Sequence, residues 1–142
     1  MRTPLISAAL IALTACGGGD TDASSASLYD RWQVTSIMAS GAEMPETVTA
    51  TMSTTLTETT YHAIVAGQSD KGTIVVDGAA SPPRIDITGT DGPNAGTFTK
   101  AVYQLDGDTL TISYDVTGQA YPADFDSQPG RTDMVVTYKR AE

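Results

Sequence analysis

From Leu28 to the C-terminus, apolar and polar residues alternate in short runs, which is the pattern of half-buried β-strands. Residues 48–56 show it most clearly, because apolar side chains there alternate with threonine and serine. Threonine is frequent and favours strands over helices, and no long apolar stripe has helical spacing. The pattern predicts eight strands, at residues 30–39, 48–56, 58–66, 72–77, 83–89, 96–105, 109–116 and 133–140.

The same alternation predicts which side chains share a face of each strand. In the first strand the predicted inward residues are Trp32, Val34, Ser36 and Met38. In the last strand they are Met134, Val136, Tyr138 and Arg140. Inward residues of the middle strands include Ile74, Val76, Ile85, Ile87, Leu110, Ile112 and Tyr114.

Turn signals separate the runs, at Ser40-Gly41, Asp77-Gly78, Asp91-Gly92-Pro93 and Gln128-Pro129-Gly130. Asp106-Gly107 is the strongest hairpin signal, because a type I′ turn needs positive φ at both central residues. Eight short, locally connected strands predict an all-β fold, an eight-stranded antiparallel up-and-down barrel in which closure removes exposed edges. A β-sandwich is the alternative.

The N-terminus has a different pattern. Met1 and Arg2 form a short positive segment, and residues 5–13 form an apolar run. That run is too short for a transmembrane helix, which needs about 20 residues, and fits the apolar region of a signal peptide. It ends in Leu13-Thr14-Ala15-Cys16, which resembles the lipobox of bacterial lipoproteins. An ordinary secretory signal with an incidental cysteine is the alternative.

The lipobox resemblance implies that residues 1–15 are removed and that Cys16 becomes the lipidated first residue, anchoring the protein to a membrane of the cell envelope. Several acyl chains would make that anchor stable. Gly17 rather than Asp follows Cys16, which favours the outer membrane over the inner one. Residues 16–27 are the lipidated cysteine and a flexible Gly/Ser/Asp-rich linker, and residues 28–142 form one domain.

Composition narrows the function classes. The chain has 142 residues, with 8 Lys+Arg against 17 Asp+Glu and a formal net charge of −9, which argues against nucleic acid as a partner and against electrostatic docking on anionic lipid. One cysteine excludes an internal disulfide, and one histidine excludes the two-histidine metal motifs. We therefore predict no metal and no cofactor.

Six short motifs occur in order along the predicted domain. They are Trp32-Gln33-Val34, Ile85-Asp86-Ile87, Gly92-Pro93-Asn94-Ala95-Gly96, residues 103–110 (YQLDGDTL), Pro122-Ala123-Asp124-Phe125 and Lys139-Arg140. In this series the chain resembles a lipocalin-like domain family of uncharacterised secreted proteins and lipoproteins, expanded in planctomycetes. The resemblance implies a lipocalin-like barrel and carries no established activity. The chain departs from lipocalins proper at Asp30, where they usually have glycine, and from the family at Tyr121, where an arginine often stands.

Trp32 and Arg140 are a candidate structural pair. Both project inward by alternation, on the first and last strands, which are neighbours in a closed barrel. In lipocalins an arginine packs across this tryptophan and closes one end of the barrel. We therefore interpret the pair as barrel-closing and not as catalytic.

A second candidate set could line a ligand cavity: Met38, Met52, Tyr61, Tyr103, Tyr114, Tyr138 and Met134. Small-ligand sites are mostly apolar with a few polar groups, as this set is. An eight-stranded barrel can instead be filled by its own side chains, so a filled core and a cavity both remain open. Phe125, in the long connection at residues 117–132, is a candidate plug over one barrel end.

His62 is the one side chain whose ordinary pKa lies near neutrality, but no catalytic partner or motif accompanies it, so a surface or rim histidine is the simpler interpretation. Asp106, Asp108, Asp124 and Asp126 fit solvated loop charges better than cation ligands. The favoured function is non-catalytic: binding of a small apolar molecule or lipid. The alternatives are a filled barrel that acts as a structural or protein-interaction module, with an unknown protein partner, and an enzyme built around His62.

Overall fold

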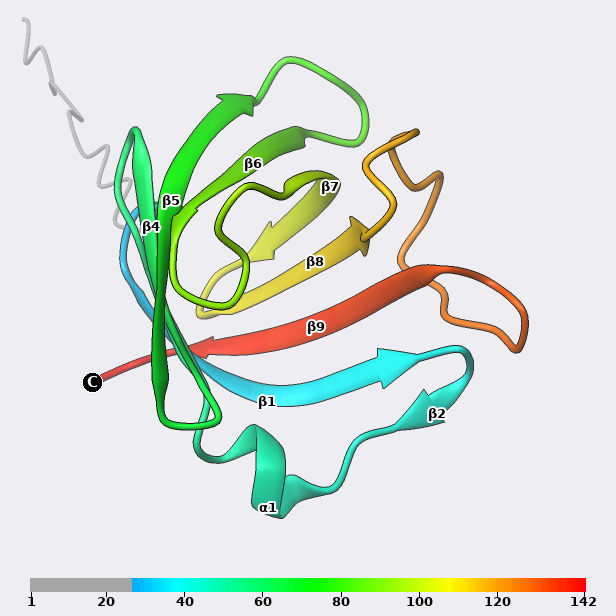
Figure 1. Cartoon of the computed structure of the whole chain (residues 1–142). Helices are drawn as coiled ribbons and strands as arrows, with labels where there is room; N and C mark the ends of the chain where they lie inside the picture. The colour runs from blue at the N-terminus through cyan, green and yellow to red at the C-terminus, as the bar shows by residue number, and fades with distance from the viewer. Residues whose placement is uncertain (1–26) are drawn as a thin grey trace, which may run out of the picture.

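The computed structural model describes residues 27–142, so the predicted signal peptide and Cys16 lie outside the described residues. Figure 1 shows strands wrapped around a common axis, with one short helix beside them. The elements are β1 (Arg31–Ala39), β2 (Ala42–Glu43), α1 (Glu46–Thr49), β3 (Ser53–Leu56), β4 (Thr60–Val65), β5 (Gln68–Asp77), β6 (Arg84–Asp91), β7 (Phe98–Asp106), β8 (Thr109–Asp115) and β9 (Asp133–Arg140).

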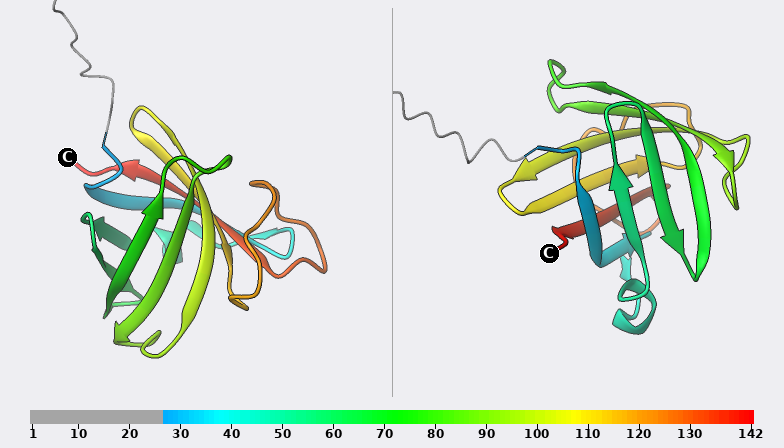
Figure 2. Two further views of the ribbon diagram at one scale, coloured as in Figure 1. Left: turned by 90° about the horizontal axis from the view of Figure 1, so that it is seen from above. Right: turned by 90° about the vertical axis from the view of Figure 1, so that its left-hand side faces the viewer.

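The sheet closes on itself. From β3 to β9 each strand pairs antiparallel with the next, and β1 pairs with both β3 and β9, which gives a ring of eight strands. The closing ladder runs from Trp32 opposite Arg140 to Ala39 opposite Met134. The predicted all-β, up-and-down antiparallel barrel is confirmed, and the sandwich alternative is wrong. Two further views in Figure 2 show the same ring from above and from the side. Residues 27–142 thus contain a closed sheet with its own core, as a domain that folds alone requires.

The first strand departs from simple alternation. A register shift between Val34 and Ser36 interrupts its pairing with β9, which is the signature of a β-bulge. After the bulge the inward position passes to Ile37, which is 2% exposed. The prediction that Ser36 and Met38 share the inward face of Trp32 is therefore wrong, because one extra residue moves every later side chain to the other face.

The predicted strand at residues 48–56 is wrong in its first half. Residues 46–49 form the helical turn α1, and β3 begins only at Ser53. Pro45 precedes the turn and its carbonyl accepts the backbone N–H groups of Val48 and Thr49. The hydroxyl of Thr51 donates to the Val48 carbonyl at 2.8 Å. Threonine hydroxyls that bond to the nearby backbone compete with strand pairing, and proline has no N–H for a strand ladder. The alternation therefore predicted the wrong structure for these residues.

Turn chemistry also differs from the expectation. The predicted hairpin between β7 and β8 is present, but its two turn residues are Gly107 and Asp108, and only Gly107 has positive φ. It is therefore not a type I′ turn. A turn with positive φ at both central residues joins β4 to β5 at Ala66 and Gly67, and it starts β5 four residues earlier than the predicted strand at 72–77.

The two ends of the barrel differ. One end is occupied by Trp32, which is fully buried and whose indole N–H donates to the Leu28 carbonyl. Arg140 lies over the Trp32 ring at 4.4 Å from its centroid. The long β8–β9 connection does not plug the other end: it extends to one side of the barrel in Figure 1, and Phe125 is not among the residues that line the interior cavity. The expectation that Phe125 acts as a plug is wrong.

Candidate ligand cavity

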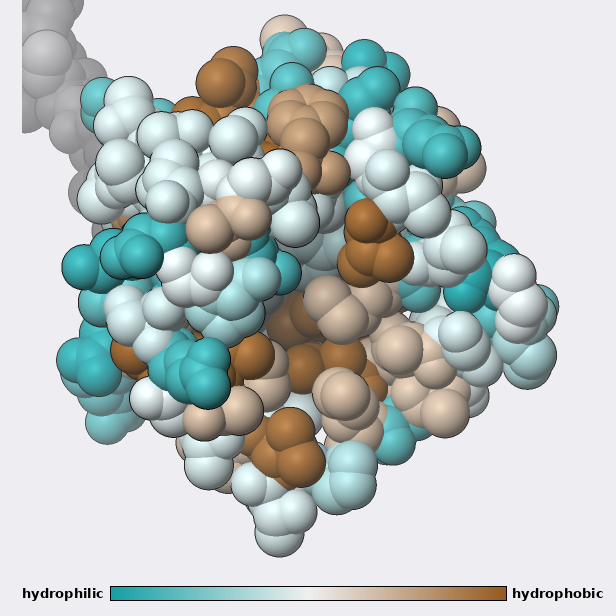
Figure 3. Space-filling model, viewed as in Figure 1, coloured by the Kyte–Doolittle hydropathy of each residue, from teal (hydrophilic) through white to brown (hydrophobic). Residues whose placement is uncertain are grey.

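The barrel encloses a cavity of about 500 Å³ that opens at the end away from Trp32. Figure 3, which has the same orientation as Figure 1, shows the hollow, with hydrophobic residues inside a mostly polar surface. Its walls come from all eight strands of the ring and from α1. Residues on opposite sides of it, such as Ile37 of β1 and Ile85 of β6, are far apart in the sequence.

Side-chain size explains why one half of the barrel is hollow. In the closed half, Trp32 and Leu110 are fully buried and fill the interior. In the open half the inward positions include Thr54, Ala63 and Thr99, whose side chains are too small to fill the space across the barrel. An eight-stranded ring has an interior just wide enough for large side chains to fill, so small ones leave space for a ligand.

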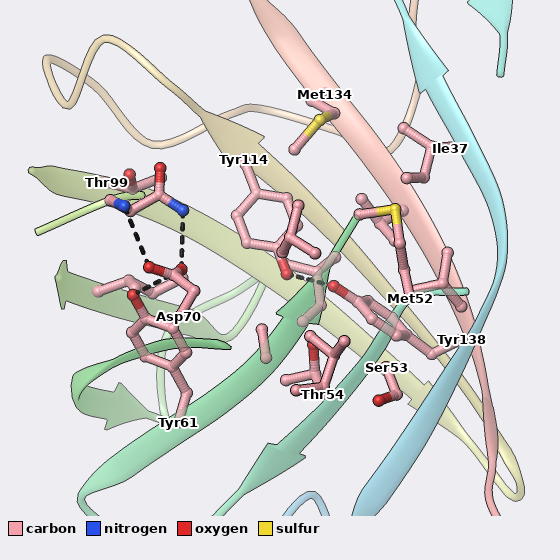
Figure 4. Close-up of a pocket in the computed structure, with 18 of the residues that line it drawn as sticks. Ile37, Met52, Ser53, Thr54, Tyr61, Asp70, Thr99, Tyr114, Met134 and Tyr138 are labelled. Carbon is pink, nitrogen blue, oxygen red and sulfur yellow. Dashed lines mark hydrogen bonds between the residues drawn. The ribbon is translucent and has the colours of Figure 1, made fainter. Parts of the chain in front are cut away.

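A carboxylate lies in the wall of the cavity. Asp70 of β5 is 2% exposed, and it accepts three hydrogen bonds. The Tyr61 hydroxyl donates to it at 3.1 Å, the Asn94 side-chain amide at 2.7 Å, and the Asn94 backbone N–H at 3.1 Å. Figure 4 shows this cluster at one side of the cavity. The two bonds from Asn94 tie the β6–β7 loop to β5.

Two tyrosine hydroxyls form the second polar feature. Tyr114 of β8 and Tyr138 of β9 point toward each other in Figure 4, with their oxygens 2.6 Å apart. Burial raises the pKa of Tyr138 to about 12 and, with the neighbouring Tyr138 hydroxyl, raises the pKa of Tyr114 well above its ordinary value. Burial and the nearby Asp70 carboxylate raise the pKa of Tyr61 to about 12. All three phenols are therefore neutral near pH 7.

The structure separates the predicted cavity residues into two groups. Met52, Met134, Tyr61, Tyr114 and Tyr138 line the cavity. Met38 and Tyr103 do not, and their assignment to the lining is corrected.

The two corrections have different causes. Met38 lies beyond the β1 bulge and is displaced from the inward face. Tyr103 packs against the core, but near Gly78 of the β5–β6 loop, at the closed end. Sequence alternation gives the face of a strand and not the height along the barrel axis, so it could not separate Tyr103 from the cavity.

Sequence reasoning missed Asp70 and Asn94. A usable signal was present for Asp70. Counting back in steps of two from the inward residues Ile74 and Gly72 reaches Asp70, so the predicted strand had only to be extended back toward the Ala66-Gly67 turn. The contact with Asn94 could not be found, because it joins a strand to a loop 24 residues away.

The remaining candidates lie outside the cavity. His62 is exposed on β4, and its Nε2 lies 2.8 Å from the Ser69 hydroxyl. Asp124 pairs with Arg131 at 3.0 Å, and Asp108 pairs with Arg140 at 3.1 Å. Within residues 27–142, no group of three or more histidine, cysteine or carboxylate side chains is placed to hold a metal ion.

Arg140 connects several segments at the closed end. Besides Asp108 it forms an ion pair with Asp30, and it donates to the carbonyl oxygens of Ser27 and Gly107 at 3.2 Å. Hydrogen bonds from the Arg31 backbone N–H and from Arg140 lower the pKa of Asp30. The aspartate that stands where lipocalins usually have glycine thus takes part in the closure around Trp32.

The mouth of the cavity carries exposed apolar side chains. Met44 and Val48, before and within α1, and Val116, after β8, all line the cavity and are between 39% and 56% exposed. An apolar rim lets an apolar molecule enter without crossing a polar barrier.

Comparison with protein-family models, with curated proteins and with solved structures finds no match for this chain. No helix among residues 27–142 has the length and apolarity to cross a membrane.

Proposed function

We propose that this protein is a lipid-anchored lipoprotein of the cell envelope whose lipocalin-like barrel binds a small apolar molecule or lipid without catalysis. The observation that carries the proposal is the cavity of about 500 Å³, open at one end of the barrel. Small-molecule sites occupy about 300–1,000 Å³ and are mostly apolar with a few placed polar groups. The cavity has that size and composition, with Asp70 and the Tyr114–Tyr138 pair as its polar groups.

A barrel that served only as a solid support would be expected to fill its interior. Protein interiors are packed to the density of organic crystals, with few voids larger than a water molecule. Unfilled volume forgoes van der Waals contacts in its lining and lowers stability. The open half of this barrel forgoes those contacts around Thr54, Ala63 and Thr99, which a binding function explains.

The proposed anchor rests on Leu13-Thr14-Ala15-Cys16 and the apolar run before it. The described chain begins at Ser27, whose carbonyl accepts a hydrogen bond from Arg140 at the closed end of the barrel. The chain that leads back to Cys16 therefore leaves from the end opposite the mouth. Attachment at that end would leave the mouth free for a ligand.

A structural or protein-interaction role is the second candidate. Exposed apolar residues on the outer surface favour it, since Val75 is 67% and Phe98 45% exposed. These two side chains do not line the cavity, so they belong to a surface separate from its walls. An enzyme centred on His62 would have to act on the outer face of β4, outside the cavity.

The test is native mass spectrometry of gently purified residues 27–142, before and after incubation with a lipid and metabolite extract. We expect a discrete added mass that is lost on denaturation. A chain that stays unliganded with every extract would contradict the binding proposal and favour the interaction role.

A matched pair of variants locates any binding. Ala63→Leu adds three carbons inside the cavity, whereas His62→Leu adds a leucine to the outer face of the same strand. We expect the first variant to lose the added mass and the second to keep it. Circular dichroism checks that both variants are folded. Retention of the ligand by Ala63→Leu together with loss by His62→Leu would place the site outside the barrel.

A further inference from the structure

The charged side chains that line the cavity are of one sign. Among the described residues that line it, Asp70 is the one carboxylate, and none is lysine, arginine or histidine. The three tyrosines in the wall are held neutral by burial and by their neighbours. An incoming molecule therefore meets one negative charge in apolar surroundings and no positive charge.

Asp70 lacks a positive partner within the described residues. Its hydrogen bonds come from neutral donors, Tyr61 and Asn94, and none of the described ion pairs includes it. A carboxylate has about four acceptor sites, and three are occupied here. Burying a charge is costly unless it is paired. A cation that reached Asp70 would therefore be attracted more strongly than it would be by the same carboxylate in water, which screens the interaction.

The geometry points to a ligand class, and this inference rests on the proposed function. We propose that the cavity takes an amphiphile with an apolar chain and a cationic amine head, seats the head at Asp70, and disfavours the corresponding carboxylate. The volume of about 500 Å³ equals roughly 17 water molecules at about 30 Å³ each, which suits a chain of about a dozen carbons.

Charge outside the cavity acts in the same direction. The chain carries a net charge of −9, so anionic amphiphiles are repelled before they reach the mouth and cationic ones are attracted. This long-range effect is screened by salt, whereas a contact with buried Asp70 is screened much less. Measurements at low and high salt therefore separate the local contact from general attraction to an acidic protein.

The experiment uses isothermal titration calorimetry of residues 27–142 with dodecylamine, dodecanol and dodecanoate, each below its aggregation concentration and at two salt concentrations. These probes have the same alkyl chain length and differ in the head group. We expect the amine to bind about tenfold more tightly than the alcohol at high salt, with the carboxylate weakest. Equal affinities at high salt would overturn the inference while leaving the binding function intact.

Two variants test whether Asp70 is the cause. Asp70→Asn removes the charge with little change in shape, and Asp91→Asn removes a charge from an exposed position at the end of β6. We expect Asp70→Asn to bring the affinities for amine and alcohol within about threefold of each other, and Asp91→Asn to preserve the preference. A preference that survives Asp70→Asn would overturn the assignment.

Two further outcomes remain distinguishable. If Asp70→Asn loosens the β6–β7 loop and unfolds at a lower temperature, the ranking of the three probes on the wild-type chain still decides whether the cavity prefers a cationic head group. If none of the three probes binds the wild-type chain, both the inference and the proposed binding of apolar chains fail together.

Discussion

The closed and open ends of the barrel are built from the same eight strands, yet they are filled in opposite ways. At the closed end Trp32 is fully buried, and Arg140 covers it while it binds Asp30, Asp108 and two carbonyl oxygens. At the open end the inward side chains are small, and the rim residues Met44, Val48 and Val116 are exposed. At the closed end a paired arginine covers a filled interior, whereas at the open end apolar side chains are exposed around a hollow.

This difference indicates that the two ends of the barrel have different roles, one in stability and the other in binding. The closed end joins both ends of the described chain and packs the largest side chain, so most of the stability should depend on it. The open end is less tightly packed and exposes apolar atoms. Ligand affinity should therefore be most sensitive to substitutions at this end. Substitutions at the two ends should therefore have separable effects on stability and on affinity.

The largest effect is expected for Trp32→Ala at the closed end. Loss of a fully buried tryptophan should lower the free energy of unfolding by about 3–5 kcal/mol, because it removes apolar burial and leaves a void. Chemical denaturation followed by circular dichroism measures it. Tyr29→Ala is the control, since Tyr29 lies nearby but is 37% exposed. Comparable losses in the two variants would contradict a dominant role for Trp32.

The sequence predicted the fold class because alternation is a local signal, and most strands lie within a few residues of their expected bounds. It failed where one residue changes the outcome. The bulge between Val34 and Ser36 reversed the faces of the rest of β1, and Pro45 turned the start of an alternating run into α1. Periodicity carries no information about either event, because both depend on backbone geometry and not on polarity.

The cavity was harder to predict than the barrel. Tyrosines and methionines that line it were found from composition and alternation, but its volume depends on which residues lie at the same height on different strands. Thr54, Ala63 and Thr99 surround the same space only through the register of separate strand pairs. Asp70 was missed because the predicted strand began two residues too late to include it.

A smaller effect on stability is expected for Asp115→Asn, at the root of the β8–β9 loop. The Asp115 carboxylate accepts hydrogen bonds from the backbone of Thr117, Gln119 and Ala120 and from the Thr117 hydroxyl. In asparagine an NH2 group, which can only donate, takes the place of one of the two accepting oxygens. The free energy of unfolding of the variant should therefore be lower by about 1–3 kcal/mol at neutral pH. Asp106→Asn, at an exposed hairpin position, is the control for the change of charge.

The effect of Asp115 should depend on pH. Burial raises its pKa, but the hydrogen bonds from Thr117, Ala120 and Gln119 outweigh burial, so the pKa is lowered from the ordinary 3.8. The stabilisation is therefore complete above about pH 4 and is lost as pH falls through the folded-state pKa. Denaturation curves between about pH 6 and pH 2 should show the gap between wild type and Asp115→Asn closing. A gap that is constant with pH would contradict this origin.

Tyr138→Phe inside the cavity should lower the free energy of unfolding by about 1 kcal/mol near pH 7, because it leaves the Tyr114 hydroxyl without its partner. Burial raises the pKa of Tyr138 to about 12, so its contribution is complete below the unfolded-state pKa of about 10 and declines as pH rises toward 12. Stability measured from about pH 8 to pH 11 should therefore show wild type losing its advantage over the variant. An advantage that grows with pH would exclude a raised pKa.

The smallest effect on stability is expected at the mouth. Val116→Ser should change the free energy of unfolding by no more than about 0.5 kcal/mol, because Val116 is 56% exposed. It should nevertheless weaken dodecanol binding by about fourfold, which corresponds to loss of roughly one buried methylene. Val75→Ser is the matched control, since Val75 is 67% exposed on the outer face of β5 and does not line the cavity. If the two variants bind dodecanol equally well, the rim does not contact the ligand, and the division between the two ends is confined to the interior of the barrel.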